Sequence, residues 1–329
     1  MIVDLPSTTT SKVNHALVEI RERGGAVALG RVLTLVIVTD DSAQVEESIA
    51  AANEASREHP CRVLVVARGA KRAATRLDAQ IRVGGDAGAS EVLVLRLYGP
   101  LADHGDSVVV PLLLPDCPVV TWWPDAAPAV PAQDPLGALA QRRITDAAAA
   151  RHPIKALDAR RSSYADGDTD LAWARLTPWR ALLAAALDLP PYDKVDAATV
   201  TGAADNPSTD LLAGWLRSRL GIPVRREATE PGGGVSSAVL ERRCGPVELI
   251  RPHGRVGTLR QPGQPERRVA LKRRTVRECL AEELRRLDPD ETYQQALEAL
   301  TEIEGRVGTT QRRSGSARGA RPAETRSDS

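Results

Sequence analysis

The sequence has 329 residues, of which 42% are hydrophobic and 26% charged, and its net charge at neutral pH is +1. This is the composition of an ordinary globular protein, and the length suits two α/β domains that need no metal or disulfide for stability. A nucleic-acid binder usually carries a basic excess, so the balanced charge argues against such a partner. The longest apolar runs are far shorter than the ~20 residues of a membrane helix, so we expect no membrane-spanning segment.

The cysteines indicate a reducing compartment. Four are spread widely along the chain, with no C-x-x-C pair and no Cys/His spacing typical of a metal site: Cys61, Cys117, Cys244 and Cys279. Most lie among apolar or strand-like residues, which favours buried free thiols. The first residues lack the charged and apolar regions of a signal peptide, so we expect a cytoplasmic protein.

The first 125 residues predict an N-terminal α/β domain. Apolar residues at helical spacing predict a helix over 11–23, and a β-branched run predicts a buried strand over 31–39. Asp41 with Gln44 has the pattern of a capping box, so a helix should follow and end near His59-Pro60. A second buried strand at 62–67 completes a parallel β-α-β unit. Further elements are expected in this order: strands at 81–85 and 91–97, a helix within the ambiguous segment 100–114, and a strand at 118–123.

Four prolines within 124–135 predict a linker or long surface loop, and we place a Pro-rich linker at 126–135. The second α/β domain is predicted over 136–304. Its first elements are helices near 136–142 and 170–188, a strand at 197–203, and a helix capped by Asn206 and ended by Gly221. Short strands separated by turns over 222–271 predict an antiparallel meander. Two closing helices follow, one started by a Thr275/Glu278 capping box and the other near Asp290, and residues 305–329 are expected to be a disordered basic tail.

No pattern of catalytic, cofactor or metal residues emerges from the chain. The glycines of 24–30 and 84–88 lack the strand-glycine-helix order of a phosphate loop, so they are interpreted as turns. Residues 166–170 (DGDTD) lack the Gly and Glu positions of an EF-hand, which favours a solvated loop whose last Asp caps a helix. The five histidines show no ligand spacing, and no G-x-S-x-G motif is present. We therefore predict a protein that is not an enzyme.

The tryptophans are the remaining unusual feature. Aromatic residues make up only 3% of the chain and Phe is absent, yet three of the five Trp lie in two short motifs, WWP at 122–124 and TPWR at 177–180. Trp and Arg are enriched at interface hot spots, which makes Trp122, Trp123, Trp179 and Arg180 candidates for a partner surface. The alternative is that each Trp fills core space in the absence of Phe, and the sequence favours neither reading.

Several segments together resemble the OpcA family of glucose-6-phosphate dehydrogenase assembly proteins, in the form found in actinobacteria. They are GGAVALGRVLTL (24–35), HPCRVL (59–64), LLLPDCPVVTWWP (112–124), LAWARLTPWR (171–180) and DLLAGWL (210–216). Each motif is short, but their order and spacing are specific, and the resemblance runs from about residue 7 to 303.

The resemblance implies a non-catalytic protein that assembles or allosterically activates glucose-6-phosphate dehydrogenase, the entry enzyme of the oxidative pentose phosphate pathway. The dehydrogenase, and not this chain, would then bind NADP and the sugar phosphate. Two alternatives follow from the residues themselves. Two α/β lobes with a cleft between them suit an enzyme or binding protein for a sugar phosphate, and the basic tail suits a nucleic-acid binder.

Overall fold

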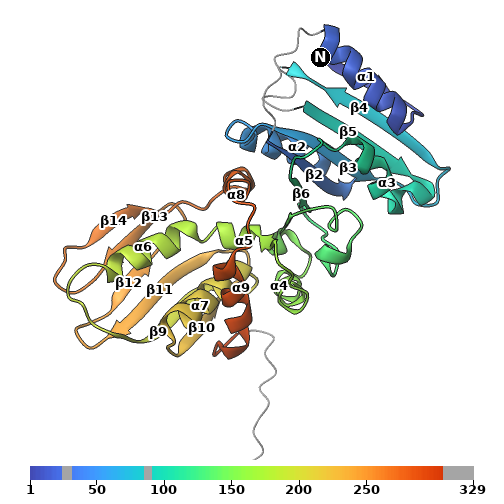
Figure 1. Ribbon diagram of the computed structural model, residues 1–329. Helices are drawn as coiled ribbons and strands as arrows, with labels where there is room; N and C mark the ends of the chain where they lie inside the picture. The colour runs from blue at the N-terminus through green and yellow to red at the C-terminus, as the bar shows by residue number, and fades with distance from the viewer. Residues whose placement is uncertain (24–31, 85–90, 307–329) are drawn as a thin grey trace, which may run out of the picture.

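The computed structural model describes residues 1–23, 32–84 and 91–306, which form two β-sheets in two lobes (Figure 1). The α/β fold class predicted from the sequence is confirmed. The first sheet lies in the lobe drawn from blue to green, and the second in the lobe drawn from yellow to red. Helices α5 (Leu171–Ala174) and α8 (Val276–Glu283) lie where the two lobes meet.

The first sheet has eight strands in the order β1-β4-β5-β3-β2-β6-β7-β8. Strands β5, β3, β2, β6, β7 and β8 run parallel, while β1 and β4 are antiparallel to their neighbours. The strand bounds are β1 Ile2–Leu5, β2 Leu33–Asp40, β3 Cys61–Arg68, β4 Arg76–Arg82, β5 Glu91–Tyr98, β6 Val119–Trp122, β7 Arg142–Thr145 and β8 Asp168–Asp170.

The predicted β-α-β unit is confirmed, because β2 and β3 pair in parallel and α2 (Gln44–Ala55) connects them. The predicted cap is wrong. Ala43 occupies the N-cap position and makes no side-chain hydrogen bond to the helix. The Asp41 carboxylate instead accepts hydrogen bonds from Arg96 Nε at 3.1 Å and Tyr98 Oη at 2.8 Å. Two residues of β5, which is separated from β2 by β3, thus hold the side chain that was predicted to cap the helix.

Helices cover both faces of the first sheet. On one face α1 (Thr10–Arg23) and the short α3 (Gly105–Val109) form a core in which Val13 and Leu17 pack with Val36. On the other face α2 and α8 form a core that includes Ile49 and Leu280. Helix α8 comes from the C-terminal end of the chain, so a late segment completes a layer of the N-terminal sheet.

The helix expected within 100–114 is present as the short α3, which is flanked by the 3₁₀ turns η2 (Gly99–Asp103) and η3 (Val110–Leu112), each with a proline near its start. The helix predicted near 136–142 is absent. Residues 136–142 form turns that lead into β7. Gly137 lies so close to Pro131 that an added Cβ would stand 1.9 Å from the Pro131 carbonyl oxygen, so this turn requires glycine here.

The first sheet continues past the Pro-rich segment. Strands β7 and β8 follow residues 126–135 in the chain but pair with β6 and with each other. Helix α4 (Pro153–Ser162), which the sequence did not indicate, connects these two strands. The predicted domain limits at 1–125, 126–135 and 136–304 stay a prediction, while the strand pairing itself extends to Asp170.

The second sheet has six strands in the order β10-β9-β11-β12-β13-β14. The antiparallel meander predicted over 222–271 is confirmed for β11 to β14, but β10 pairs in parallel with β9. Parallel neighbours need a long crossover connection, and helix α7 supplies it between β9 and β10. The strand bounds are β9 Val195–Ala203, β10 Val224–Thr229, β11 Val235–Arg242, β12 Val247–Ile250, β13 Val256–Arg260 and β14 Arg267–Ala270.

Helices α6 (Thr177–Leu187), α7 (Pro207–Leu220) and α9 (Glu291–Glu298) pack on one face of this sheet. Local sequence signals decided their ends. The Asn206 side chain accepts from the Thr209 N–H at 3.3 Å, and Gly221 ends α7 with a φ of 66°. The Thr275/Glu278 capping box of α8 is present, and Asp290 caps α9. The predicted tail at 305–329 lies almost wholly outside the described residues.

Candidate functional site

A cleft opens where the carboxyl ends of the parallel strands in the first sheet face the second lobe. This edge is where open α/β sheets usually bind ligands. The inner part of the cleft is a cavity of about 330 Å³. Its walls come from the residue after β7, the α5–α6 segment, the start of α7, the β10–β11 loop and the chain before α8, represented by Asp146, Trp179, Asn206, Gly234 and Arg274.

The outer part of the cleft is a cavity of about 840 Å³ that shares Gly234, Arg251 and Arg273 with the inner part. It is also lined by His253 and Arg255 of the β12–β13 turn. We call the two parts together the arginine cleft. Each part by itself is in the size range of cavities that hold small organic ligands.

Arg251 is fixed at the boundary between the two parts. Its side chain is buried, with 7% exposure, and it donates hydrogen bonds to the carbonyl oxygens of Val235 at 2.8 Å and Leu271 at 3.2 Å. The guanidinium carbon lies 5.1 Å from the centre of the Trp179 ring. Burial, followed by the nearby charge of Arg273, lowers the pKa of Arg251 to about 10. The group therefore stays cationic at neutral pH, in an environment that disfavours its charge.

Three other cations around the cleft are neutralised by carboxylates. Arg175 donates to both oxygens of Asp146 at 2.7 and 2.6 Å, and Lys272 lies 2.6 Å from Glu278. Arg274 forms an ion pair with Glu282 and donates to the Ala174 carbonyl at 2.7 Å. By contrast, neither Arg251 nor Arg273 forms an ion pair with any of the described residues. The cleft thus carries positive charge that the described part of the chain leaves uncompensated.

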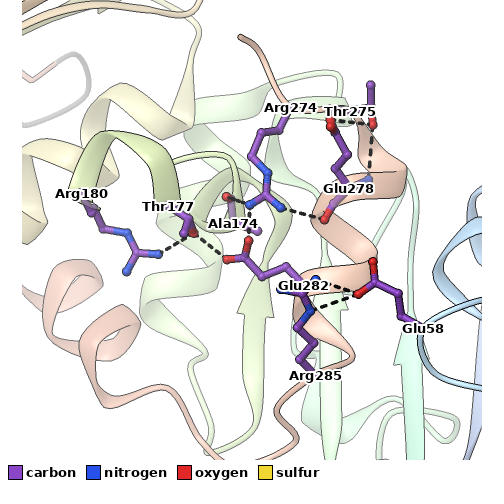
Figure 2. A network of polar contacts seen from close by, with 9 residues as sticks. All are labelled: Glu58, Ala174, Thr177, Arg180, Arg274, Thr275, Glu278, Glu282 and Arg285. Atoms are coloured by element: carbon purple, nitrogen blue, oxygen red, sulfur yellow. Dashed lines mark hydrogen bonds and ion pairs between the residues drawn. The ribbon is translucent and has the colours of Figure 1, made fainter. Parts of the chain in front are cut away.

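The wall formed by α8 is held by the polar network of Figure 2. Arg274 reaches from the chain before α8 toward Ala174 and the carbonyl of Glu278, and Glu282 of α8 accepts a hydrogen bond from Thr177 at 2.5 Å. On the other side, Arg285 donates to Glu58, which follows α2, at 2.7 Å. The network joins elements of both lobes, so the cleft walls are fixed with respect to each other.

The four residues predicted for a partner surface separate into two groups. Trp122, Trp123 and Trp179 are 1%, 0% and 1% exposed, so they fill core space as the alternative reading held. In this structure their side chains offer no surface to a partner. Arg180 is half-buried and lies over the ring of Trp173, with its guanidinium carbon 3.7 Å from the ring centre.

Arg180 lines a separate groove between α6, α8 and α9, with a volume of about 710 Å³. Its Nη2 donates to Thr177 Oγ1 at 3.0 Å. The indole N–H of Trp173 donates to Asp290 at 2.8 Å, which fixes the ring beneath the arginine. Of the four candidates, Arg180 is the one with an accessible side chain in a groove, because Trp179 lines the inner part of the arginine cleft with only 1% of its surface exposed.

The acidic segment 166–170 is buried from residue 167 onward, contrary to the solvated loop that was expected, and only Asp166 is exposed. Asp168 and Asp170 are buried in β8, where Asp170 caps α5 as predicted by accepting from the Ala172 N–H at 2.9 Å. Thr145 Oγ1 and the Ala147 N–H donate to its other oxygen at 2.6 and 2.9 Å. Burial, together with the charge of Asp146, raises the pKa of Asp170 to about 7. This carboxylate lines a separate cavity of about 310 Å³, next to Thr145 and Arg160, and not the arginine cleft.

None of the four cysteines forms a disulfide within the part of the chain that the structure describes. Cys61 and Cys279 are buried as predicted, whereas Cys117 is partly exposed and Cys244 exposed. Among the described residues no group of His, Cys, Asp and Glu has a geometry that could hold a metal ion. Within the same part of the chain, no helix has the length and apolar character that crossing a bilayer requires. The glycine-rich segment 24–30 and most of 84–88 lie outside the described residues.

Comparison with known proteins decides the family. One family model, the glucose-6-phosphate dehydrogenase subunit N-terminal domain, matches residues 52–162, and another, the C-terminal domain of the same subunit, matches residues 166–297. The chain belongs to the OpcA family. The two matches together include strands β3 to β14 and meet between β7 and β8. The arginine cleft is lined mainly by residues of the C-terminal match.

Other comparisons add little to the OpcA assignment. No curated protein shows a significant match. A solved structure from E. coli, described as trehalose-6-phosphate bound with UDP-2-fluoro glucose, aligns at 10% identity and a TM-score of 0.24. The alignment covers 60% of this chain and 65% of that chain, and a likeness this remote carries no argument about fold or ligand.

Sequence reasoning missed Arg251 and Arg273. The available signals were the basic run Lys272-Arg273-Arg274 and the glycines of the β10–β11 turn, which the sequence shows only as a charged segment and a loop. Arg251 follows β12 and lies 22 positions before Arg273 in the numbering. Only the pairing of β11 with β12 and the fold of the following chain place both guanidinium groups against Gly234.

Proposed function

We propose that this protein is a non-catalytic assembly factor and allosteric activator of glucose-6-phosphate dehydrogenase in the oxidative pentose phosphate pathway. The observation that carries the proposal is the pair of consecutive family matches over 52–162 and 166–297, both of which are described as domains of a glucose-6-phosphate dehydrogenase subunit. In this role the dehydrogenase supplies the catalytic groups and the NADP site. The present chain supplies a binding surface, and we place it in the cytoplasm with its partner.

The architecture supports an activator that acts as a rigid body. Helix α8 packs on α2 of the first lobe and on α5, and the ion pairs of Figure 2 connect the same elements. A ligand that binds only one conformation of an enzyme shifts the enzyme toward that conformation. A partner with fixed lobes can act in this way with little loss of its own conformational entropy.

Arg180 is the residue that we propose for contact with the dehydrogenase. Its groove lies at the meeting point of α6, α8 and α9, and arginine stacked on an aromatic ring is a frequent hot-spot arrangement. Trp122, Trp123 and Trp179 would contribute by supporting the fold rather than by touching the partner, because their side chains are buried.

The test is the activity of the dehydrogenase from the same organism, titrated with this protein across a range of glucose 6-phosphate concentrations. We expect a saturable rise in kcat or fall in KM, no NADP reduction by this protein alone, and co-elution of the two proteins on a sizing column. An unrelated protein of equal mass serves as the control for non-specific stabilisation. Unchanged kinetics together with separate elution would contradict the proposal.

A further inference from the structure

The arginine cleft concentrates positive charge in a site that the described residues do not neutralise. Arg251, Arg255 and Arg273 line its outer part together with His253, and no Asp or Glu of the described chain lines that part. Side chains of Arg255 and Arg273 make no hydrogen bond or ion pair with the described residues. Arg251 is buried, whereas Arg255 and Arg273 are exposed. A buried cation without a counter-ion is destabilising, so the Arg251 charge calls for an anion that compensates it, and the two exposed guanidinium groups can contact the same anion.

The cleft is preformed rather than a gap between mobile side chains. The Asn206 amide donates to the Gly233 carbonyl at 3.1 Å, which ties the β10–β11 loop to the start of α7. Arg251 is held by two backbone carbonyls and by Trp179, and its other N–H groups have no acceptor among the described residues. A guanidinium that is fixed in this way can donate to an anion without a further loss of side-chain entropy.

Glycine at position 234 allows a close approach. A Cβ at this position would stand 3.1 Å from Arg251 Nη2 and 3.3 Å from Arg273 Nε, so both guanidinium groups converge on the bare backbone of one residue. The start of α7, a helix of 14 residues, lines the same cavity through Asn206 and Ser208, and its dipole adds positive potential. The site therefore offers the guanidinium N–H donors of Arg251 and Arg273 and the positive N-terminal end of α7.

From this geometry we propose that the arginine cleft binds the phosphate group of a small phosphorylated molecule, with Arg251 and Arg273 as the principal ligands of the phosphate and Arg255 as an outer contact. Guanidinium groups that converge in this way match the geometry and charge of a phosphate monoester. The outer cavity leaves room for the rest of the molecule, such as a sugar. This proposal concerns the isolated chain and does not depend on its partner.

The experiment is isothermal titration calorimetry on the full-length protein alone, with inorganic pyrophosphate and glucose 6-phosphate as probes and glucose as the uncharged control. We expect saturable binding of the phosphorylated probes, weaker binding at higher salt, and no binding of glucose. Arg273→Ala should weaken the binding at least about tenfold, because it removes a charge-assisted contact. Arg273 is exposed, so this substitution is not expected to disturb folding.

Arg243→Ala is the matched control, because Arg243 is an exposed arginine on the β11–β12 turn of the same sheet, outside the cleft. It should bind the probes as tightly as the natural protein. Arg255→Ala is a second variant at an exposed residue of the cleft. We expect it to weaken the binding of the phosphorylated probes less than Arg273→Ala does.

Absence of binding by any phosphorylated probe at millimolar concentration would overturn the proposal, as would binding that Arg273→Ala and Arg255→Ala leave unchanged. If both variants bind the probes as tightly as the natural protein but bind the dehydrogenase more weakly, the phosphate proposal is wrong and the cleft binds an acidic segment of the dehydrogenase. The activator titration measures dehydrogenase activity, whereas calorimetry measures binding to this protein alone. A negative result in the activity experiment therefore leaves the calorimetric test intact.

Discussion

Arg142 of β7 and Glu283 of α8 form a buried ion pair, with Arg142 Nη2 2.5 Å from Glu283 Oε2 and side-chain exposures of 4% and 5%. Arg142 also donates to the Asp288 carbonyl at 2.9 Å. Because β7 belongs to the first sheet and α8 to the C-terminal part of the chain, this pair holds α8 against the N-terminal sheet. Both residues line the groove of Arg180, and the pair is one reason why the two lobes keep a fixed arrangement.

Glu283→Gln should destabilise the protein by about 3 kcal/mol, because it leaves the Arg142 charge buried without a counter-ion. Urea unfolding followed by tryptophan fluorescence measures the change. The control is Glu58→Gln, which breaks the exposed Glu58–Arg285 pair and should leave the free energy of unfolding almost unchanged, because solvent screens the pair. If the two substitutions changed the free energy of unfolding equally, burial would not explain the contribution of the Arg142–Glu283 pair to stability.

The raised pKa of Asp170 makes stability depend on pH. A carboxyl group whose pKa rises from 3.8 to about 7 on folding binds its proton more tightly in the folded state. The free energy of unfolding should therefore fall as the pH rises from about 4 to 7, by at most roughly 4 kcal/mol, and should level off above pH 7. Urea unfolding at several pH values between 4.5 and 8.5 measures this slope.

Asp170→Asn should flatten that slope in part. Burial also raises the pKa of Asp168 and of Glu283, so a residual slope of the same sign is expected. Asp196→Asn, an exposed position at the start of β9, is the control and should leave the slope unchanged. A stability that rises between pH 5 and 7 would contradict the assignment.

The capping box of α8 is a local device with a measurable effect. Thr275 Oγ1 accepts from the Glu278 N–H at 3.3 Å, and the Glu278 carboxylate accepts from the Thr275 N–H at 2.8 Å. Thr275→Ala should lower the free energy of unfolding by about 1 kcal/mol, and Thr275→Ser should restore most of it. Thermal melting compares the three proteins, and a Ser variant as unstable as the Ala variant would argue against the cap as the cause.

Trp179 is expected to act through packing. Its side chain is buried in the core of the second lobe, so Trp179→Ala should destabilise the protein by about 3–5 kcal/mol. Trp179→Phe keeps most of the apolar volume and should cost clearly less. Circular dichroism and urea unfolding provide the measurement. A Trp179→Ala protein that keeps its stability but loses affinity for the dehydrogenase would return this residue to the partner surface.

Arg180 tests the proposed contact with the dehydrogenase. Arg180→Ala should weaken binding by about tenfold while the fold, checked by circular dichroism, stays intact. The measurement is the concentration of this protein that gives half-maximal activation. Arg243→Ala is the exposed control outside the groove. Unchanged activation by Arg180→Ala would remove Arg180 from the interface and leave the family role untouched.

The sequence alone determined the elements that local signals control. Helix α7 begins at Asn206 and ends at Gly221 because cap and stop residues act within one turn of the chain. The buried strands β2, β3 and β5 were predicted because continuous apolar runs are typical of central strands. The family resemblance, carried by motifs such as WWP at 122–124, was likewise readable from the sequence and is confirmed by the two family matches.

Only the tertiary structure decided which distant residues meet. The strands β7 and β8 are short and polar, so the sequence has no apolar run that would predict them. Their charged residues Arg142 and Asp168 are buried in ion pairs that only the folded chain brings together. Similarly, the local sequence predicted that Asp41 caps a helix, but in the structure its carboxylate binds Arg96 and Tyr98. The arginine cleft arises because β12 and the chain before α8 converge on Gly234, a meeting set by strand register and helix packing over long sequence separations. Local propensity carries no information about such contacts, which is why the fold class was accessible from the sequence and the site was not.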